Sequence, residues 1–81
     1  MKVKYIGETF GVDGLTDGKI YDCLAVENAG EFGKMLRIVD DSEEDYLYDP
    51  ISPRPLDGSS AGGRWIVVED DKDTSLKQLI G

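Results

Sequence analysis

Five carboxylates fall within the six residues 40–45, the densest group of side chains in the chain that could do chemistry. Carboxylate oxygens bind hard cations such as Ca²⁺, and paired carboxylates can act as general acid and base. Their spacing follows no cation-binding loop, and nothing nearby predicts the apolar pocket that would raise the pKa of one of them. The segment therefore indicates a solvated turn rather than a metal or catalytic site.

Two further motifs fail at positions that their chemistry requires. Asp71, Asp73 and Ser75 have the spacing of the first three ligands of an EF-hand loop, but Leu76 replaces the glycine that the turn needs. Residues 58–64 have the glycine spacing of a phosphate-binding loop, but arginine and tryptophan follow where lysine and a hydroxyl residue are required. We therefore expect no metal, phosphate or cofactor site.

Cys23 is the only cysteine, and the chain contains no histidine. An internal disulfide is thus excluded, and a thiol nucleophile would lack its commonest activating base. The apolar neighbours Leu24 and Val26 indicate that Cys23 is buried. A small domain without disulfides is typical of a reducing compartment, so we expect a cytoplasmic protein. Because no catalytic group can be identified, we also expect that the protein is not an enzyme.

Aromatic side chains are better candidates for binding than the carboxylates. Phe10, Tyr46, Tyr48 and Trp65 could together line a groove for a protein partner, and we take them as the candidate interaction surface. Alternation along a strand places both tyrosines on one face, so their partial burial in the core is the simpler alternative. Whether these tyrosines are exposed or buried in the folded protein decides between a binding surface and a role in the core.

The elements that would position these side chains are short and rich in β-forming residues. Apolar segments alternate with turn residues, and no long stretch has helical spacing. Residues 49–63 contain three prolines and then a glycine-serine run, which predicts a flexible loop appended to the fold. Helical spacing after Thr74 and Ser75 predicts a short helix within the acidic tail, residues 70–81. Strands are expected at 3–6, 20–27, 35–40, 45–48 and 64–69.

Three segments carry a resemblance to a family: KYIG at 4–7, LTDGKIY at 15–21 and RIVDDSEEDYLY at 37–48. They resemble small proteins of bacteriophages and prophages of Gram-positive bacteria that have a Src-homology-3-like (SH3-like) barrel. The likeness covers most of residues 3–69 and implies an all-β class, a five-stranded SH3-like barrel and a cytoplasmic setting. It implies no biochemical activity. We expect one such domain over residues 1–81, with a longer loop at 49–63 than family members usually have.

The net charge of the chain restricts the classes of molecule that it can bind. Seventeen acidic and nine basic residues give a net charge of −8, so the surface should repel nucleic-acid phosphates. No apolar stretch approaches the roughly 20 residues of a membrane-spanning helix. We therefore expect a monomeric, phage-type accessory protein that binds a protein partner. The alternatives are an acidic decoy that mimics nucleic acid to occupy a basic host protein, and an enzyme, which would need a concave site with convergent polar groups.

Overall fold

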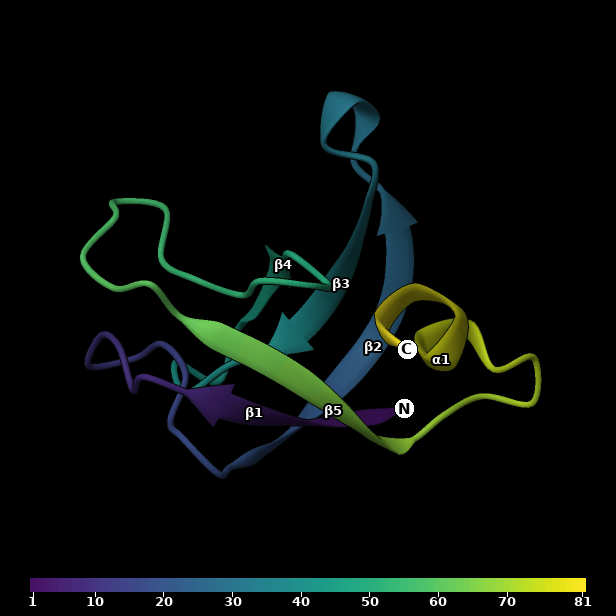
Figure 1. The fold of residues 1–81 in the computed structure, drawn as a ribbon, viewed down its shortest axis with the longest axis horizontal. Coiled ribbons are helices and arrows are strands. Elements are labelled where there is room, and N and C mark those ends of the chain that lie inside the picture. Colours follow the sequence, from purple (N-terminus) through teal and green to yellow (C-terminus); the bar gives the residue numbers. More distant parts are fainter.

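The computed structural model describes all of residues 1–81 and consists of five strands and one α-helix (Figure 1). All neighbouring strands are antiparallel, and they form one sheet in the order β4-β3-β2-β1-β5. The all-β class and the five predicted strands are thereby confirmed, and the topology is compatible with an SH3-like barrel. The elements are β1 (Lys2–Gly7), β2 (Ile20–Asn28), a 3₁₀ turn η1 (Gly30–Phe32), β3 (Lys34–Val39), β4 (Asp45–Tyr48), β5 (Gly63–Glu69) and α1 (Ser75–Ile80).

The long strand β2 joins the two halves of the sheet (Figure 1). Its first residues pair with β1 and its later residues with β3. Tyr21 and Cys23 point into the core, as alternation predicts. The register then shifts between Cys23 and Ala25, and such a bulge changes which face the following residues occupy. Leu24 is exposed, as alternation with Cys23 requires. Val26 lies past the bulge and packs against the core, although strict alternation would place it on the same face as Leu24.

The core is built around Trp65. Its ring meets those of Tyr5, Tyr21 and Tyr48 edge-on, at centroid distances of 5.8, 6.3 and 6.2 Å. Its indole N–H donates a hydrogen bond to the carbonyl oxygen of Asp49, 3.0 Å away, which satisfies the polar atom of the buried ring. The buried members of this hydrophobic core are Val3, Tyr5, Phe10, Leu15, Tyr21, Cys23, Leu36, Ile38, Trp65 and Leu76.

Helix α1 covers the end of the sheet near both chain termini (Figure 1). Its Leu76 is fully buried, which explains why so short a helix persists. Thr74 occupies the N-cap position but its side chain makes no capping bond. Two aspartates cap the helix instead: Asp70 accepts the N–H groups of Leu76 and Lys77 at 2.9 and 3.0 Å, and Asp71 accepts that of Ser75 at 2.9 Å. The predicted terminal helix is confirmed. No helix in the structure has the length and apolar character needed to span a membrane.

The segment 49–63 divides into packed ends and an exposed tip. Pro50 and Pro53 are buried, and the Pro53 carbonyl accepts the N–H of Gly63 at 3.0 Å. Residues 56–59, at the tip, are exposed. The ends thus belong to the packed structure, contrary to the interpretation of the whole segment as an appended loop. Flexibility remains a prediction for the tip alone.

Candidate functional site

An open groove of about 890 Å³ lies alongside β4 and is lined by segments that are far apart in the sequence. These are the turn 10–14, the end of η1, residues of β3 and β4, and the turn 54–57. We call this feature the β4 groove. The strands supply its rigid part, and the turns that border it belong to the loops after β1, β2 and β4.

Large apolar side chains stand exposed around the β4 groove. Phe32 is 75% exposed, Tyr46 50%, Leu47 37%, and Leu56 is fully exposed. Single exposed apolar residues are ordinary on protein surfaces. A group gathered by the fold around one concave feature is instead typical of a binding site.

The four aromatic residues predicted as an interaction surface separate into two groups. Tyr46 lines the groove and is exposed, and Tyr48 lines it only in part because its ring also packs against Trp65. Phe10 and Trp65 are buried core residues, so the hypothesis that they offer an exposed surface is wrong. The cause of their burial is aromatic packing: Trp65 lies at the centre of the core, and the Phe10 ring packs against that of Tyr5, although Phe10 still borders the groove.

Sequence reasoning missed Phe32, Leu47 and Leu56. Phe32 and Leu56 lie in turns whose other residues are small, polar, charged or proline, so each is a lone large apolar residue where none is needed for a core. That isolation is the one signal available in the sequence. Alternation along the strand assigns Leu47 to the face opposite Tyr46, but it does not tell whether that face is exposed.

The lining of the β4 groove is acidic. Arg37, one of its two arginines, is already engaged: its guanidinium donates to both carboxylate oxygens of Glu27, and a third bond reaches Asp45 at 3.3 Å. The hydrogen bond from Arg37 lowers the pKa of Glu27, and the same bond raises the pKa of Arg37. Arg54 is the other cation. Against these two stand five aspartates: Asp13, Asp40, Asp45, Asp49 and Asp57.

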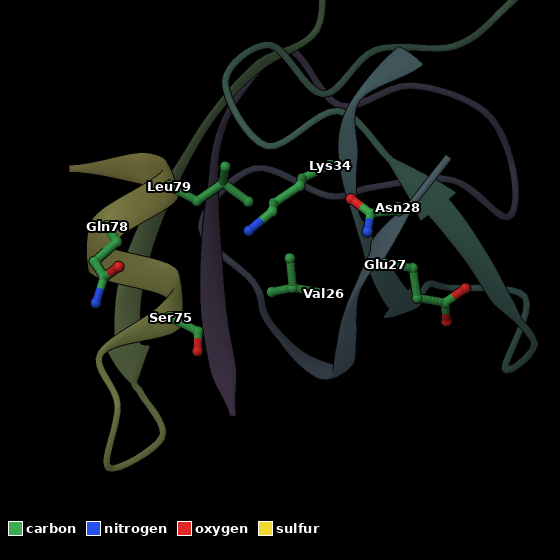
Figure 2. Close-up of a pocket in the computed structure, with 7 residues that line it drawn as sticks. All are labelled: Val26, Glu27, Asn28, Lys34, Ser75, Gln78 and Leu79. Carbon is green, nitrogen blue, oxygen red and sulfur yellow. The ribbon is translucent and has the colours of Figure 1, made fainter. Parts of the chain in front are cut away.

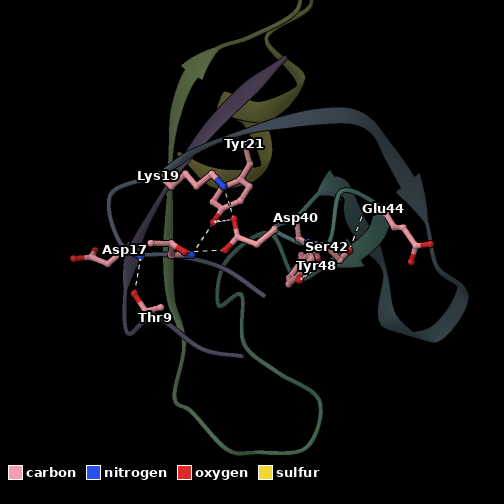
Figure 3. Close-up of polar contacts among 10 residues, drawn as sticks. Thr9, Asp17, Lys19, Tyr21, Asp40, Ser42, Glu44 and Tyr48 are labelled. Carbon is pink, nitrogen blue, oxygen red and sulfur yellow. Dashed lines mark hydrogen bonds and ion pairs between the residues drawn. The ribbon is translucent and has the colours of Figure 1, made fainter. Parts of the chain in front are cut away.

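Asp40 is a buried member of the acidic segment, and hydrogen bonds surround its carboxylate (Figure 3). One oxygen accepts the Tyr48 hydroxyl at 2.7 Å, and the other accepts the N–H of Ser42 at 2.9 Å together with its hydroxyl. Burial, followed by the bond to Asp40, raises the pKa of Tyr48. The carboxylate therefore fixes the β3–β4 turn and the inner end of the groove.

Asp41 ties the long loop between β1 and β2 to the β3–β4 turn. Its carboxylate accepts hydrogen bonds from the Lys19 ammonium at 2.6 Å, the Thr16 hydroxyl at 2.8 Å and the Tyr21 hydroxyl at 3.0 Å. Burial raises the pKa of Asp41, but these bonds outweigh burial, so the pKa is lowered. The turn 10–14 precedes this loop anchor, so the anchor helps to position one side of the groove.

We expect Asp41→Asn to lower the free energy of unfolding at pH 7 by about 1–3 kcal/mol, the range for hydrogen bonds to charged groups. The pKa of Asp41 is lower in the folded state, so the stabilisation exists above the unfolded-state pKa of about 3.9 and is lost as the pH falls through the folded-state pKa. Urea denaturation from pH 7 to pH 3 measures the difference, which should shrink below about pH 4. Asp22→Asn, at an exposed ion pair, is the control with an effect under about 1 kcal/mol. A difference for Asp41→Asn that stays constant with pH would contradict this account.

A second hollow of about 400 Å³ lies between α1 and the β2–β3 hairpin (Figure 2). Val26 and Leu79 face each other across it and both pack against the core. The Glu27 carboxylate turns away from α1 in Figure 2, because Arg37 holds it on the other side of the hairpin. The hollow thus marks where α1 packs on the sheet and brings no set of convergent groups together.

Cys23 is buried, as its apolar neighbours predict. Burial raises the pKa of its thiol, so the neutral form predominates at pH 7. The side chain acts as a small apolar residue of the core.

Comparisons of the chain with family models, with curated proteins and with solved structures found no match. The resemblance to small phage proteins accordingly stays an expectation. The β4 groove, with its exposed apolar side chains and its acidic lining, is the feature on which a function can be argued.

Proposed function

We propose that the protein is a non-catalytic protein-interaction module that binds its partner in the β4 groove. The observation that carries this proposal is the gathering of four exposed apolar side chains, Phe32, Tyr46, Leu47 and Leu56, around one concave feature. Fully burying one such side chain contributes about 1.5–3 kcal/mol, so a partner that covers several of them would gain substantial affinity. The loops bordering the groove then provide specificity, and the sheet holds them in place.

The proposed setting is that of a phage-type accessory protein in the cytoplasm. The segments that resemble small phage and prophage proteins support the first part of this proposal. A lone, buried thiol suits a reducing compartment and supports the second.

The test compares what different variants retain from a bacterial lysate. The double variant Phe32→Ser/Leu56→Ser removes the two most exposed apolar side chains of the groove. Its matched control, Ile20→Ser/Val68→Ser, removes two exposed apolar side chains that do not line the groove. We expect that the parent and the control retain the same partner protein. The groove variant should retain at least about tenfold less of it, because a loss of about 1.4 kcal/mol of binding free energy weakens affinity tenfold.

Equal retention by both double variants would contradict the proposal. A protein retained equally by both but released by moderate salt would instead support the acidic decoy, because screening weakens exposed charge–charge attraction. Circular dichroism of each variant should match the parent, since all four side chains are exposed in the folded state.

A further inference from the structure

Strand β4 is an outer strand of the sheet, and its second edge is free. In an antiparallel ladder, the residues that exchange hydrogen bonds with the neighbouring strand alternate along each strand. Asp40 donates its N–H to the Glu44 carbonyl at 3.2 Å, and Ile38 pairs with Tyr46 two residues further on. The backbone groups of Tyr46 and Tyr48 therefore face β3, whereas those of Asp45 and Leu47 point outward.

The other side of β3 gives the same alternation independently. Ala29 donates its N–H to the Gly33 carbonyl at 2.7 Å, and Met35 pairs with Glu27 two residues along. Odd-numbered residues of β3 thus bond to β2 and even-numbered residues to β4. By this alternation the ladder with β3 does not use the N–H and C=O groups of Asp45 and Leu47, and no hydrogen bond outside the ladder engages them. Four backbone groups therefore stand ready to pair with another strand.

The free edge runs along the β4 groove. Groove-lining residues come from both faces of the strand: Leu47 and Arg37 on one side, Tyr46 and Tyr48 on the other. A chain segment placed beside β4 in extended form would therefore contact both sets of side chains and pair with the outward groups of Asp45 and Leu47. No helix has this complementarity, because its backbone bonds are already made.

Charge decides which segment suits the edge. Five aspartates and two arginines line the groove, and one of these aspartates, Asp45, is paired with Arg37. The lining is acidic even when both arginines are counted. A second copy of this chain would bring another net charge of −8 and an Asp45 of its own to the same edge, which disfavours self-pairing. A basic segment is attracted instead.

We infer that the β4 groove binds an extended basic segment of a partner protein, which adds to the sheet as a strand beside β4. Lysine or arginine side chains of the segment face the aspartates of the groove, and its apolar side chains cover Leu47 and Tyr46. The inference rests on the proposed function and names the chemistry of its partner.

The test uses random twelve-residue peptides displayed on a carrier and selected on the immobilised full chain. The best peptide is then synthesised in two forms, N-methylated either at its odd or at its even positions. Only alternate residues of an added strand donate to the edge, so one form should bind at least about tenfold more weakly and the other about as well as the parent peptide. Selected peptides should be rich in lysine and arginine, and their affinity should fall as salt rises.

A pair of variants tests the same edge from the protein's side. Leu47→Pro removes an outward N–H that the fold does not use, and proline is tolerated at such edge positions. Leu47→Ala keeps this N–H and loses only apolar contact. Peptide affinity should fall at least about tenfold further for Leu47→Pro than for Leu47→Ala, with amide NMR shifts at Asp45 and Leu47 when peptide is added to the parent. Should Leu47→Pro fail to fold, the pair of N-methylated peptides decides the question.

Each of the other outcomes contradicts either this inference alone or the proposed function as well. Selection of peptides that bind in the groove but are acidic, or that tolerate both N-methylations, overturns strand addition by a basic segment and leaves the proposed function standing. Selection of no peptide, or of peptides unaffected by Phe32→Ser/Leu56→Ser, overturns both. A dimer of the free protein in sedimentation, broken by Leu47→Pro, would assign the edge to a second copy and also overturn the inference.

Discussion

Replacing Gly62 with alanine is expected to lower the free energy of unfolding by about 2–5 kcal/mol, a large part of the total for a domain of this size. Gly62 has φ +72, a left-handed conformation that costs an alanine about 1–2 kcal/mol. A Cβ atom there would also lie 1.9 Å from the Pro53 carbonyl oxygen, so the buried end of the loop would have to move. Forced rearrangement of a packed region adds about 1–3 kcal/mol. Urea denaturation of both proteins measures the effect.

Gly58→Ala is the matched control, because Gly58 has nearly the same backbone angle, φ +74, but no atom within 4 Å of the added Cβ. Gly58→Ala should lower the free energy of unfolding only by the cost of the left-handed backbone conformation, about 1–2 kcal/mol. The difference between the two variants isolates the contact with Pro53. Equal losses would mean that the 49–63 segment does not pack as the structure has it, and would restore its interpretation as an appended loop.

The segment 49–63 shows where composition stops being informative. Prolines and glycines correctly predict that no helix or strand forms there, because they restrict or free the backbone and remove donors. Composition carries no information on which of the three prolines are buried, as Pro50 and Pro53 are. Pro53 is buried because the chain returns to meet β1 and β5 at Gly62 and Gly63, a contact between residues that only the complete fold brings together.

The strands were the most predictable part of the fold, since each combines β-forming residues with a turn on either side. The bulge in β2 was not predictable, because it depends on how two partner strands share one strand. Val26 illustrates the consequence: strict alternation would place it on the exposed face with Leu24, yet after the register shift its side chain packs against the core.

The candidate site was predictable only in part, for a related reason. Alternation assigns Tyr46 and Leu47 to opposite faces, but burial depends on what the rest of the chain places over each face. Trp65 was expected at a surface and lies in the core, whereas Phe32 and Leu56 were overlooked and stand exposed. Local sequence defines the strand and its faces; the groove arises from three loops that meet beside it.

Truncating Trp65 to alanine should have the largest effect of any core substitution, about 3–5 kcal/mol, the usual cost of removing a buried tryptophan. The loss combines three edge-on aromatic contacts with the hydrogen bond to Asp49. Trp65→Phe keeps an aromatic ring and loses the N–H, so its cost should be smaller. Because Trp65 is the only tryptophan, unfolding of all proteins should be followed by circular dichroism rather than by fluorescence.

Tyr46→Ala is the control for this prediction, since Tyr46 is half exposed and its hydroxyl bonds only to the exposed Glu44. Its effect on stability should stay below about 1 kcal/mol, as is usual for surface positions. The two substitutions thereby separate the roles that the sequence could not tell apart: Trp65 supports the β4 groove from within, through Tyr48 and Asp49, and Tyr46 belongs to its accessible face. Similar losses for Trp65→Ala and Tyr46→Ala would show that this division between core and binding surface is wrong.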